Sequence, residues 1–403
     1  GATTLTDVLR NSPGVGTFYV GENGNTATGD TIYMRGFDSS SSIYVDGVRD
    51  LGSISRDVFN IQQVEVTKGP AGSDYGRSAP TGSINLASKR ASLAAANSAS
   101  IAYGSTDQRR VSADFNTSMS ASSAFRINLM AQDSGVPGRD MVENKRWGIA
   151  PSLAFGLDGN TRVHLNLLHV KQDNVPDGGV PTIGLPGYSS PDPTRPQIAS
   201  APKVDSRNFY GTRSDYDEVT ADMATLVVEH AFSETASLHN TTRWGRTSQD
   251  YLLTAWRAVA ANLKTPNIND VSTWTVTRDI PTFKDQRNTI LTNQTNLRLQ
   301  VATGGIEHDL TTGLELARAA LVAAQPMGGV AADKAFYTAW AQVWAQQVTA
   351  DEAQRRSLQD VRAPGQWRTN APIMQQGAFG SAFACKVGTP MQPKPEARIS
   401  VFH

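Results

Sequence analysis

The sequence has little cysteine, no excess of charge of one sign and no long hydrophobic run. Cys385 is the only cysteine among 403 residues, which excludes an intrachain disulfide and any metal site with several cysteine ligands. Lys plus Arg and Asp plus Glu both number 37, and this balance disfavours nucleic acid as a partner. The longest apolar run, 319–324, is far shorter than the roughly 20 residues of a membrane-spanning helix.

These absences leave a soluble protein and a membrane β-barrel as the two open classes. Strands of about ten alternating residues cross a membrane without producing a hydropathy peak. The N-terminal residues GATTL lack the basic and apolar segments of a signal peptide. We therefore expect either a mature chain or one from which a leader and more have been removed.

The first 90 residues predict a small α+β unit. Thr4 and Asp7 have the spacing of a capping box before a short amphipathic helix that Pro13-Gly14 ends. Asp46-Gly47 is a strong tight-turn signal. Four short apolar segments are flanked by turn-forming residues and read as strands, at 31–34, 43–48, 64–66 and 84–86.

The sequence motifs of this region are more specific than its predicted helix and strands. The consecutive motifs are TLTDVLRNSPGV at 4–15, IYMRGFD at 32–38, YVDGVRD at 44–50, VEVTKGPA at 64–71 and GSIN at 82–85. Together they resemble the plug domain of TonB-dependent outer-membrane siderophore receptors, with the closest match to those that take up catecholate-chelated iron. The resemblance implies a compact plug inside a wide barrel, in which Arg35 and Lys68 pair with barrel glutamates and hold the plug in place.

From about Ala99 the apolar residues recur with a period of two, as in Phe125, Ile127, Leu129 and Ala131. Further candidate strands centre on 220–229, 236–244, 274–277, 291–301 and 306–314. The alternation alone also fits a soluble β-sandwich. With the plug resemblance in front of it, we predict an α+β plug followed by an incomplete antiparallel transmembrane β-barrel of about ten strands and a helical C-terminal tail.

A long segment without a strand pattern lies between Gln172 and Asp217 and holds seven prolines from Pro176 to Pro202. Irregular chain of this length is usually functional or disordered, and in an outer-membrane barrel it would be extracellular. Its aromatic rings and guanidiniums, Arg195 among them, suit a flat anionic aromatic chelate. The substrate-binding residues that we predict are Tyr188, Arg207, Phe209, Tyr210, Arg213 and Tyr216 in this loop and Asn23, Asn25, Arg49, Arg56, Tyr75 and Arg77 on the plug. A polar loop whose aromatics pack on themselves is the alternative.

Transport rather than catalysis is the activity that the resemblance implies. A siderophore already saturates its iron, so we expect no cofactor and no metal ligand from the protein, and the six histidines form no recognised ligand spacing. The expected partners are a ferric siderophore, outer-membrane lipid and, in the intact family, a TonB-type energy-transducing protein. We expect the upstream segment that receives this energy to be missing here, and we expect a location in the outer membrane of a Gram-negative bacterium.

After Leu314 the pattern changes from strand to helix. Apolar residues from Phe336 to Val348 recur at helical spacing after Asp333, and a second short helix is expected over 352–358. The motifs FYTAWAQVW at 336–344, PGQWRTNAP at 364–372, AFACKVGTPM at 382–391 and ISVF at 399–402 resemble the C-terminal end of neprilysin-like zinc metallopeptidases. Residues 313–317 suit both families, and we hypothesise that two unrelated coding segments were joined there, by recombination or by an assembly error.

The chain resembles a zinc peptidase but lacks the residues that zinc-dependent hydrolysis requires. Zinc hydrolysis needs two histidines one helical turn apart with a glutamate base between them, and no His-Glu-x-x-His occurs in the chain. Arg362 stands where that family has a histidine that stabilises the transition state, and Arg368 alone matches its substrate-binding arginine. We therefore predict a plug at 1–92, a partial barrel at 93–315 and a peptidase-like tail at 316–403 without enzymatic activity. The alternatives are an inactive peptidase fragment fused to a β-rich region and an adhesion-like β-protein.

Overall fold

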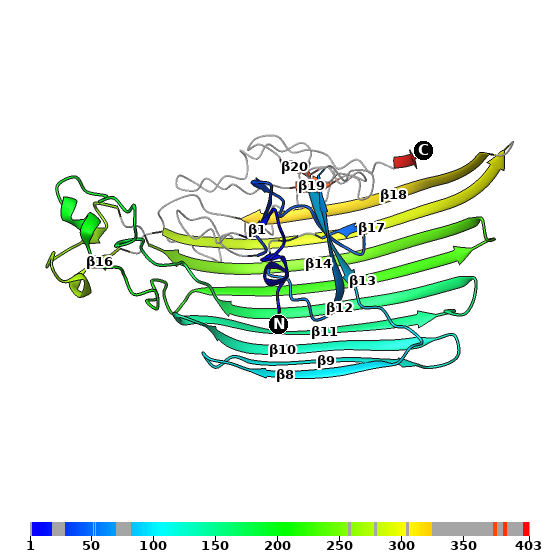
Figure 1. Ribbon diagram of the computed structural model, residues 1–403, viewed down its shortest axis with the longest axis horizontal. Coiled ribbons are helices and arrows are strands. Elements are labelled where there is room, and N and C mark those ends of the chain that lie inside the picture. The colour runs from blue at the N-terminus through cyan, green and yellow to red at the C-terminus, as the bar shows by residue number, and fades with distance from the viewer. Residues whose placement is uncertain are drawn as a thin grey trace, which may run out of the picture.

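The computed structural model describes residues 2–17, 29–50, 52, 54–69, 82–256, 259–277, 280–303 and 306–324, together with three short strands near the C-terminus. A small α+β plug lies in front of one long antiparallel sheet, which we call the wall (Figure 1). Among the described residues, no helix combines the length and the apolar character that spanning a bilayer would require.

The plug begins with the predicted capped helix. In α1 (Leu5–Leu9), the Asp7 amide donates to Thr4 Oγ1 at 3.2 Å and the Thr4 amide donates to Asp7 Oδ2 at 3.3 Å. This reciprocal pair satisfies donors that the first turn of a helix leaves without partners. Leu5 and Leu9 are fully buried, so one face of the helix enters the plug core.

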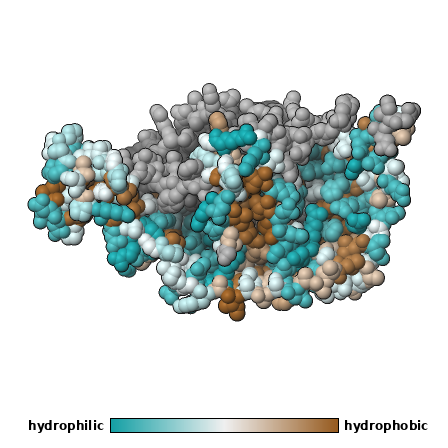
Figure 2. All heavy atoms as spheres, viewed as in Figure 1, coloured by the Kyte–Doolittle hydropathy of each residue, from teal (hydrophilic) through white to brown (hydrophobic). Residues whose placement is uncertain are grey.

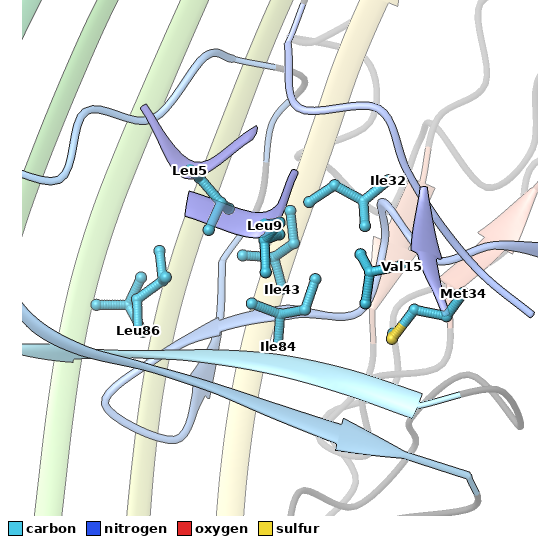
Figure 3. Close-up of a cluster of buried hydrophobic side chains, with 9 residues drawn as sticks. Leu5, Leu9, Val15, Ile32, Met34, Ile43, Ile84 and Leu86 are labelled. Atoms are coloured by element: carbon cyan, nitrogen blue, oxygen red, sulfur yellow. The ribbon is translucent and has the colours of Figure 1, made fainter. Parts of the chain in front are cut away.

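Two small sheets complete the plug. The first contains β1 (Val15–Thr17), β2 (Ile32–Met34) and β3 (Phe37–Asp38); the second runs in the order β5 (Val48–Arg49), β4 (Ile43–Val45), β7 (Gly82–Ser88), β6 (Ile61–Lys68). Asp46 and Gly47 join β4 to β5 with φ of 49° and 78°, the positive pair that a type I′ turn requires. Figure 3 shows Leu5, Leu9, Ile43, Ile84 and Leu86 converging between the helix and the second sheet.

The wall consists of long strands, each antiparallel to its neighbour. They are β8 (Ala96–Tyr103), β9 (Arg109–Ser118), β10 (Ala124–Val136), β11 (Arg139–Phe155), β12 (Thr161–Val175), β13 (Tyr216–Ala231), β14 (Ala236–Ala255), β17 (Ile280–Thr303) and β18 (Ile306–Ala324). The short strands β19 (Met374–Gln376) and β21 (Arg398–Phe402) pair with β18, and β20 (Ala382–Ala384) pairs with β19. The order runs openly from β20 to β8, so the barrel is not closed within the described residues.

One predicted strand is not part of the wall, and the predicted end of another is wrong. The segment predicted at 274–277 is not part of the wall, because β16 (Thr275–Val276) pairs with β15 (Leu263–Lys264) in a separate two-stranded sheet. The last wall strand, β18, continues to Ala324 instead of ending near Leu314, because its residues stay in register with β17 to that point. The helices predicted over 333–348 and 352–358 lie outside the described residues, as do Arg362, Arg368 and Cys385.

The alternation along the wall places polar residues toward the plug and apolar residues outward. In β14 the side chain of Arg243 is 1% exposed and that of its neighbour Trp244 is 45% exposed. The wall visible beside the plug is mainly hydrophilic (Figure 2). The large apolar residues exposed on the wall include Val111, Phe115, Leu129, Trp147, Phe155, Leu226, Leu291 and Leu314. A soluble sandwich buries its apolar face, whereas a membrane barrel turns it to lipid, so this pattern favours the barrel.

Candidate functional site

The plug contacts the wall through buried ion pairs in which the acid comes from the plug. Arg110 of β9 holds Asp57 with two bonds, Nη1 to Oδ2 at 2.7 Å and Nη2 to Oδ1 at 2.8 Å. A second wall cation, Arg146 of β11, has its Nη1 3.9 Å from Asp57 Oδ2. The Asp57 side chain is 1% exposed and that of Arg110 is 8% exposed, so solvent screens this pair little.

A second buried contact involves the turn between β4 and β5. Arg243 of β14 places Nη2 3.2 Å from Asp46 Oδ2, and its Nη1 donates to the Val45 carbonyl at 2.6 Å. Its Nε donates to Thr225 Oγ1 of β13 at 2.8 Å, which fixes the plane of the guanidinium. The positive-φ turn brings the Asp46 carboxylate and the Val45 carbonyl to the same guanidinium.

The start of the wall is tied to the plug by two further cations. Lys89 Nζ lies 3.1 Å from Asp114 Oδ2 of β9 and donates to the Phe59 carbonyl of the plug at 2.9 Å. Arg126 of β10 holds the same Asp114 through two bonds and donates to the Arg90 carbonyl at 3.1 Å. The chain leaving the plug is therefore clamped to the first strands of the wall.

One arginine of the plug binds two carboxylates of the plug itself. Arg56 Nη1 donates to Asp30 Oδ2 at 3.1 Å and its Nε donates to Asp50 Oδ2 at 2.6 Å. Burial raises the pKa of Asp30 to about 6, since a single shared guanidinium only partly offsets the loss of water around this carboxylate. Arg56 was predicted to contact substrate, and the structure places it inside the plug.

A cavity of 80 Å³ lies along the seam between plug and wall. Its lining includes Arg56, Asp57 and Phe59 from the plug and Gln172, Arg243 and Thr247 from the wall. Gln172 Nε2 crosses the seam and donates to the Ser55 carbonyl at 2.7 Å. The plug is thus joined to this side of the wall by discrete polar contacts around a void.

Arg35 and Lys68, the two residues predicted to anchor the plug, both have exposed side chains. Among the described residues neither one forms an ion pair with a wall glutamate, and their anchoring role stays a prediction. The sequence reasoning missed Arg110, Arg146 and Arg243. Each occupies an inward position directly before an exposed apolar residue, Val111, Trp147 or Trp244. An arginine at an inward position of an alternating strand was the signal that could have identified these plug contacts.

The long segment after β12 packs with the segment between β14 and β17 into an outer loop layer beyond one end of the wall (Figure 1). Ile183, Ile198, Val204 and Leu263 form its buried core. Arg195 joins the two segments, since it binds Asp192 at 2.6 Å and donates to the carbonyls of Ala260 and Leu263, both at 2.8 Å. Hydrogen bonds from Thr194 and Arg195 lower the pKa of Asp192 to about 2.

The predicted loop residues differ in how available they are. Tyr188 and Tyr210 pack against the core of the loop layer, Arg207 Nη2 lies 2.7 Å from Asp205 Oδ2, and the Tyr216 hydroxyl donates to Asp250 at 3.0 Å. Phe209 is half-buried and Arg213 is exposed. On the plug, Arg49 Nε donates to the Ser41 carbonyl at 2.9 Å. Asn23, Asn25, Tyr75 and Arg77 lie outside the described residues. The chelate contacts of this whole set remain predictions.

Within the described part of the chain, no group of three or more His, Cys, Asp or Glu side chains could hold a metal ion.

The family described as the TonB-dependent Receptor Plug Domain matches residues 1–83. The chain is 54% identical over 318 residues to the Catecholate siderophore receptor Fiu of Escherichia coli strain K12, an alignment that covers 79% of this chain and 42% of the relative. The plug and the wall belong to the TonB-dependent receptor family.

Solved structures give the same result for this receptor. The closed form of the Ferric-Catecholate import receptor Fiu from Escherichia coli K12 superposes with a TM-score of 0.78 and 46% identity, covering 93% of this chain and 50% of that one. The siderophore receptor PiuA from Acinetobacter baumannii gives a TM-score of 0.68 at 25% identity, covering 99% and 50%. The chain spans less than half the length of its curated relative Fiu. The receptor is located in the outer membrane of a Gram-negative bacterium, as predicted.

Peptidase family M13 matches residues 267–399, in agreement with the second resemblance found in the sequence. Part of that range, β17 and β18, forms wall strands of the receptor, and the chain lacks the zinc-binding motif. Two relatives, Fiu at 54% identity and the Probable TonB-dependent receptor BfrD of Bordetella pertussis strain Tohama I at 36% identity over 320 residues, are both receptors. The receptor interpretation is therefore favoured over that of a peptidase fragment.

Proposed function

We propose that this receptor takes up ferric siderophores of the catecholate class across the outer membrane. The observation that carries the proposal is its 54% identity to a catecholate siderophore receptor over 318 residues. Iron enters as cargo inside its chelator, so the protein recognises an anionic aromatic shell and supplies no metal ligand. The proposed energy source is a TonB-type partner, because a plug held by buried ion pairs does not leave the wall unaided.

The plug–wall contacts suit a plug that is firmly seated yet releasable. Removing one partner of a buried ion pair costs about 3 to 5 kcal/mol, which accounts for tight seating. Asp57 and Asp46 carry their contacts on separate short segments of the plug, and both line the seam cavity. A pull on the plug would break these contacts in turn, and the charged side chains would remain on the wall and on the plug as a polar path for an anionic chelate.

Phe209 and Arg213 are the described loop residues that we propose for the first contact with the chelate. Arg213 is exposed and forms no ion pair within the described residues, and Phe209, four residues earlier, is half-buried. An aromatic face and a free guanidinium are the groups that stack on a catecholate and neutralise its charge. Tyr188 and Tyr210 are better explained as packing residues of the loop layer.

The test is equilibrium binding of ferric chelates to the full chain in detergent, followed by quenching of tryptophan fluorescence. We expect saturable quenching by a ferric tris-catecholate and at least tenfold weaker quenching by a ferric hydroxamate. Phe209→Ala with Arg213→Ala should weaken catecholate binding about tenfold. Arg298→Ala, which removes an exposed cation at the opposite end of the wall, should leave it unchanged. Equal quenching by both chelates, or none, would contradict the proposed substrate class.

A further inference from the structure

An unpaired basic patch lies on the outward face of the wall. It consists of Lys171 in β12, Arg246 in β14, Arg287 in β17 and Arg318 in β18, all with exposed side chains. Among the described residues, none of the four forms an ion pair. Asp222, directly across from Arg246 in the register, is engaged with His169, whose Nδ1 lies 2.7 Å from Asp222 Oδ1.

The register of the strands fixes the height of this patch. Arg287 pairs with Ser248, and Ser248 lies two residues from Arg246, so the two arginines are diagonal neighbours with Cα atoms roughly 7 to 8 Å apart. Lys171 lies in the same register row as Arg287, through Thr220 and Ser248. Trp244, Leu291 and Arg318 form a register row that lies closer to the short turns than Arg246 does. The patch therefore lies along one border of the exposed apolar band, the border that is nearer to the outer loops.

The surroundings distinguish this end of the wall from the other. Near the short turns the exposed cations are paired, Arg162 with Glu229 at 3.9 Å and Arg298 with Asp309 at 3.2 Å. Beyond the basic patch, on the outer-loop side, a row of acids follows in register: Asp173, Glu218, Asp250 and Asp285. A soluble polyanion arriving from water would meet this acidic row first, whereas a lipid headgroup reaches the patch laterally within the membrane.

We propose that Arg246 and Arg287, flanked by Lys171 and Arg318, bind the phosphate of a lipid headgroup in the outer leaflet. Two guanidiniums at this spacing can each donate a forked pair of hydrogen bonds to one phosphate. Trp244 is 45% exposed and Leu291 is 54% exposed directly below them, where acyl chains and the interfacial region would contact apolar and aromatic side chains. The inference rests on the outer-membrane location and not on the proposed substrate.

The test measures lipid retention by the full chain. The protein is reconstituted in nanodiscs of phosphatidylcholine doped with phosphatidic acid, extracted, and its bound lipids are counted by native mass spectrometry. We expect selective retention of phosphatidic acid, and a photoactivatable phosphatidic acid should label β14 and β17. Arg246→Gln with Arg287→Gln should weaken retention about thirtyfold, whereas Arg246→Lys with Arg287→Lys should keep most of it. Inorganic phosphate should not displace the lipid.

The matched control is Arg298→Gln, an exposed arginine at the short-turn end, which should retain lipid as the unmodified chain does. Lys171→Gln, a milder change, covers the case in which the double variant does not fold, and should weaken retention by several-fold. Equal retention of phosphatidic acid and phosphatidylcholine by the unmodified chain would overturn the proposal. So would displacement by inorganic phosphate, or an equal loss in the Arg298→Gln control. None of these results depends on chelate binding, so failure of this proposal is distinguishable from failure of the proposed substrate.

Discussion

Replacing Asp57 by asparagine should loosen the plug from the wall without disturbing the plug itself. Asparagine has the same size and can still accept the Phe59 amide, which donates to Asp57 Oδ1 at 3.0 Å. It cannot balance the charge of Arg110, whose two bonds to Asp57 measure 2.7 and 2.8 Å, or of Arg146 at 3.9 Å. Two guanidiniums would then remain buried side by side without a carboxylate.

The expected magnitude follows from this geometry. Removal of one partner from a buried ion pair costs about 3 to 5 kcal/mol. Arg110 keeps one acceptor, Gln132 Oε1 at 2.8 Å, so the lower end of this range applies. A loss of about 3 kcal/mol shifts the equilibrium between seated and unseated plug by about 150-fold.

Hydrogen–deuterium exchange of the Ala91 and Ser92 amides follows this equilibrium, because they donate across the seam to Ser152 Oγ and Asn116 Oδ1 of the wall, both at 3.0 Å, and lose these bonds when the plug separates from the wall. Asp57→Asn should accelerate their exchange about 150-fold. Asp205→Asn makes the same change in an exposed pair with Arg207, where solvent screens the charges and little or no change in exchange is expected. A double-mutant cycle with Arg110→Gln should give a coupling energy above about 1 kcal/mol. Equal exchange in the two asparagine variants, or a coupling near zero, would refute the reasoning.

Three further outcomes follow from single residues. The pKa of Asp30 is raised from 3.8 to about 6, so between these pH values the folded plug holds a proton that the unfolded chain has released. The free energy of unfolding should therefore fall by at most about 3 kcal/mol as pH rises from about 4 to about 6. In urea titrations, Asp30→Asn should remove this dependence on pH. A Cβ at Gly82 (φ +139°) would lie 2.2 Å from the Thr67 carbonyl oxygen, whereas one at Gly47 (φ +78°) would meet nothing within 4 Å. Gly82→Ala should therefore lower the urea midpoint clearly more than Gly47→Ala, and equal midpoints would show that the clash relaxes. Arg195→Ala should release the two segments of the outer loop layer from each other and speed their cleavage in limited proteolysis, while hydrogen–deuterium exchange in β13 and β14 stays unchanged as a control for folding.

Local signals in the sequence were sufficient to predict the elements of the plug. The capping box at Thr4 and Asp7 and the turn at Asp46-Gly47 act within a few residues, and both appear in the structure with the expected geometry. The alternation along the wall was likewise readable, because a period of two is a property of each strand alone. It could not reveal which face points inward, since that depends on what each face contacts.

The partners of the charges could not be read from the sequence. Arg243 binds a carboxylate 197 residues earlier in the chain, and Arg110 binds one 53 residues earlier. Such pairs are set by which strand of the wall lies opposite each plug turn, and this depends on the register of the whole sheet. The same limit explains why the sequence did not show that a carboxylate 26 residues away binds Arg56 within the plug; its contact with substrate stays a prediction.

The extent of β18 bears on where the receptor-like part of the chain gives way to the peptidase-like part. Leu310, Leu314 and Leu316 are all exposed on the outward face, which is the period of two that a wall strand requires and not the 3.6 period of a helix. The register with β17 continues without a shift from Ile306 to Ala324. A junction at 313–317 would have placed foreign sequence in the middle of a regular wall strand. We therefore propose that any junction lies after Ala324, and sequencing the genomic locus across codons 300 to 330 and beyond should show receptor-like coding sequence continuing at least that far.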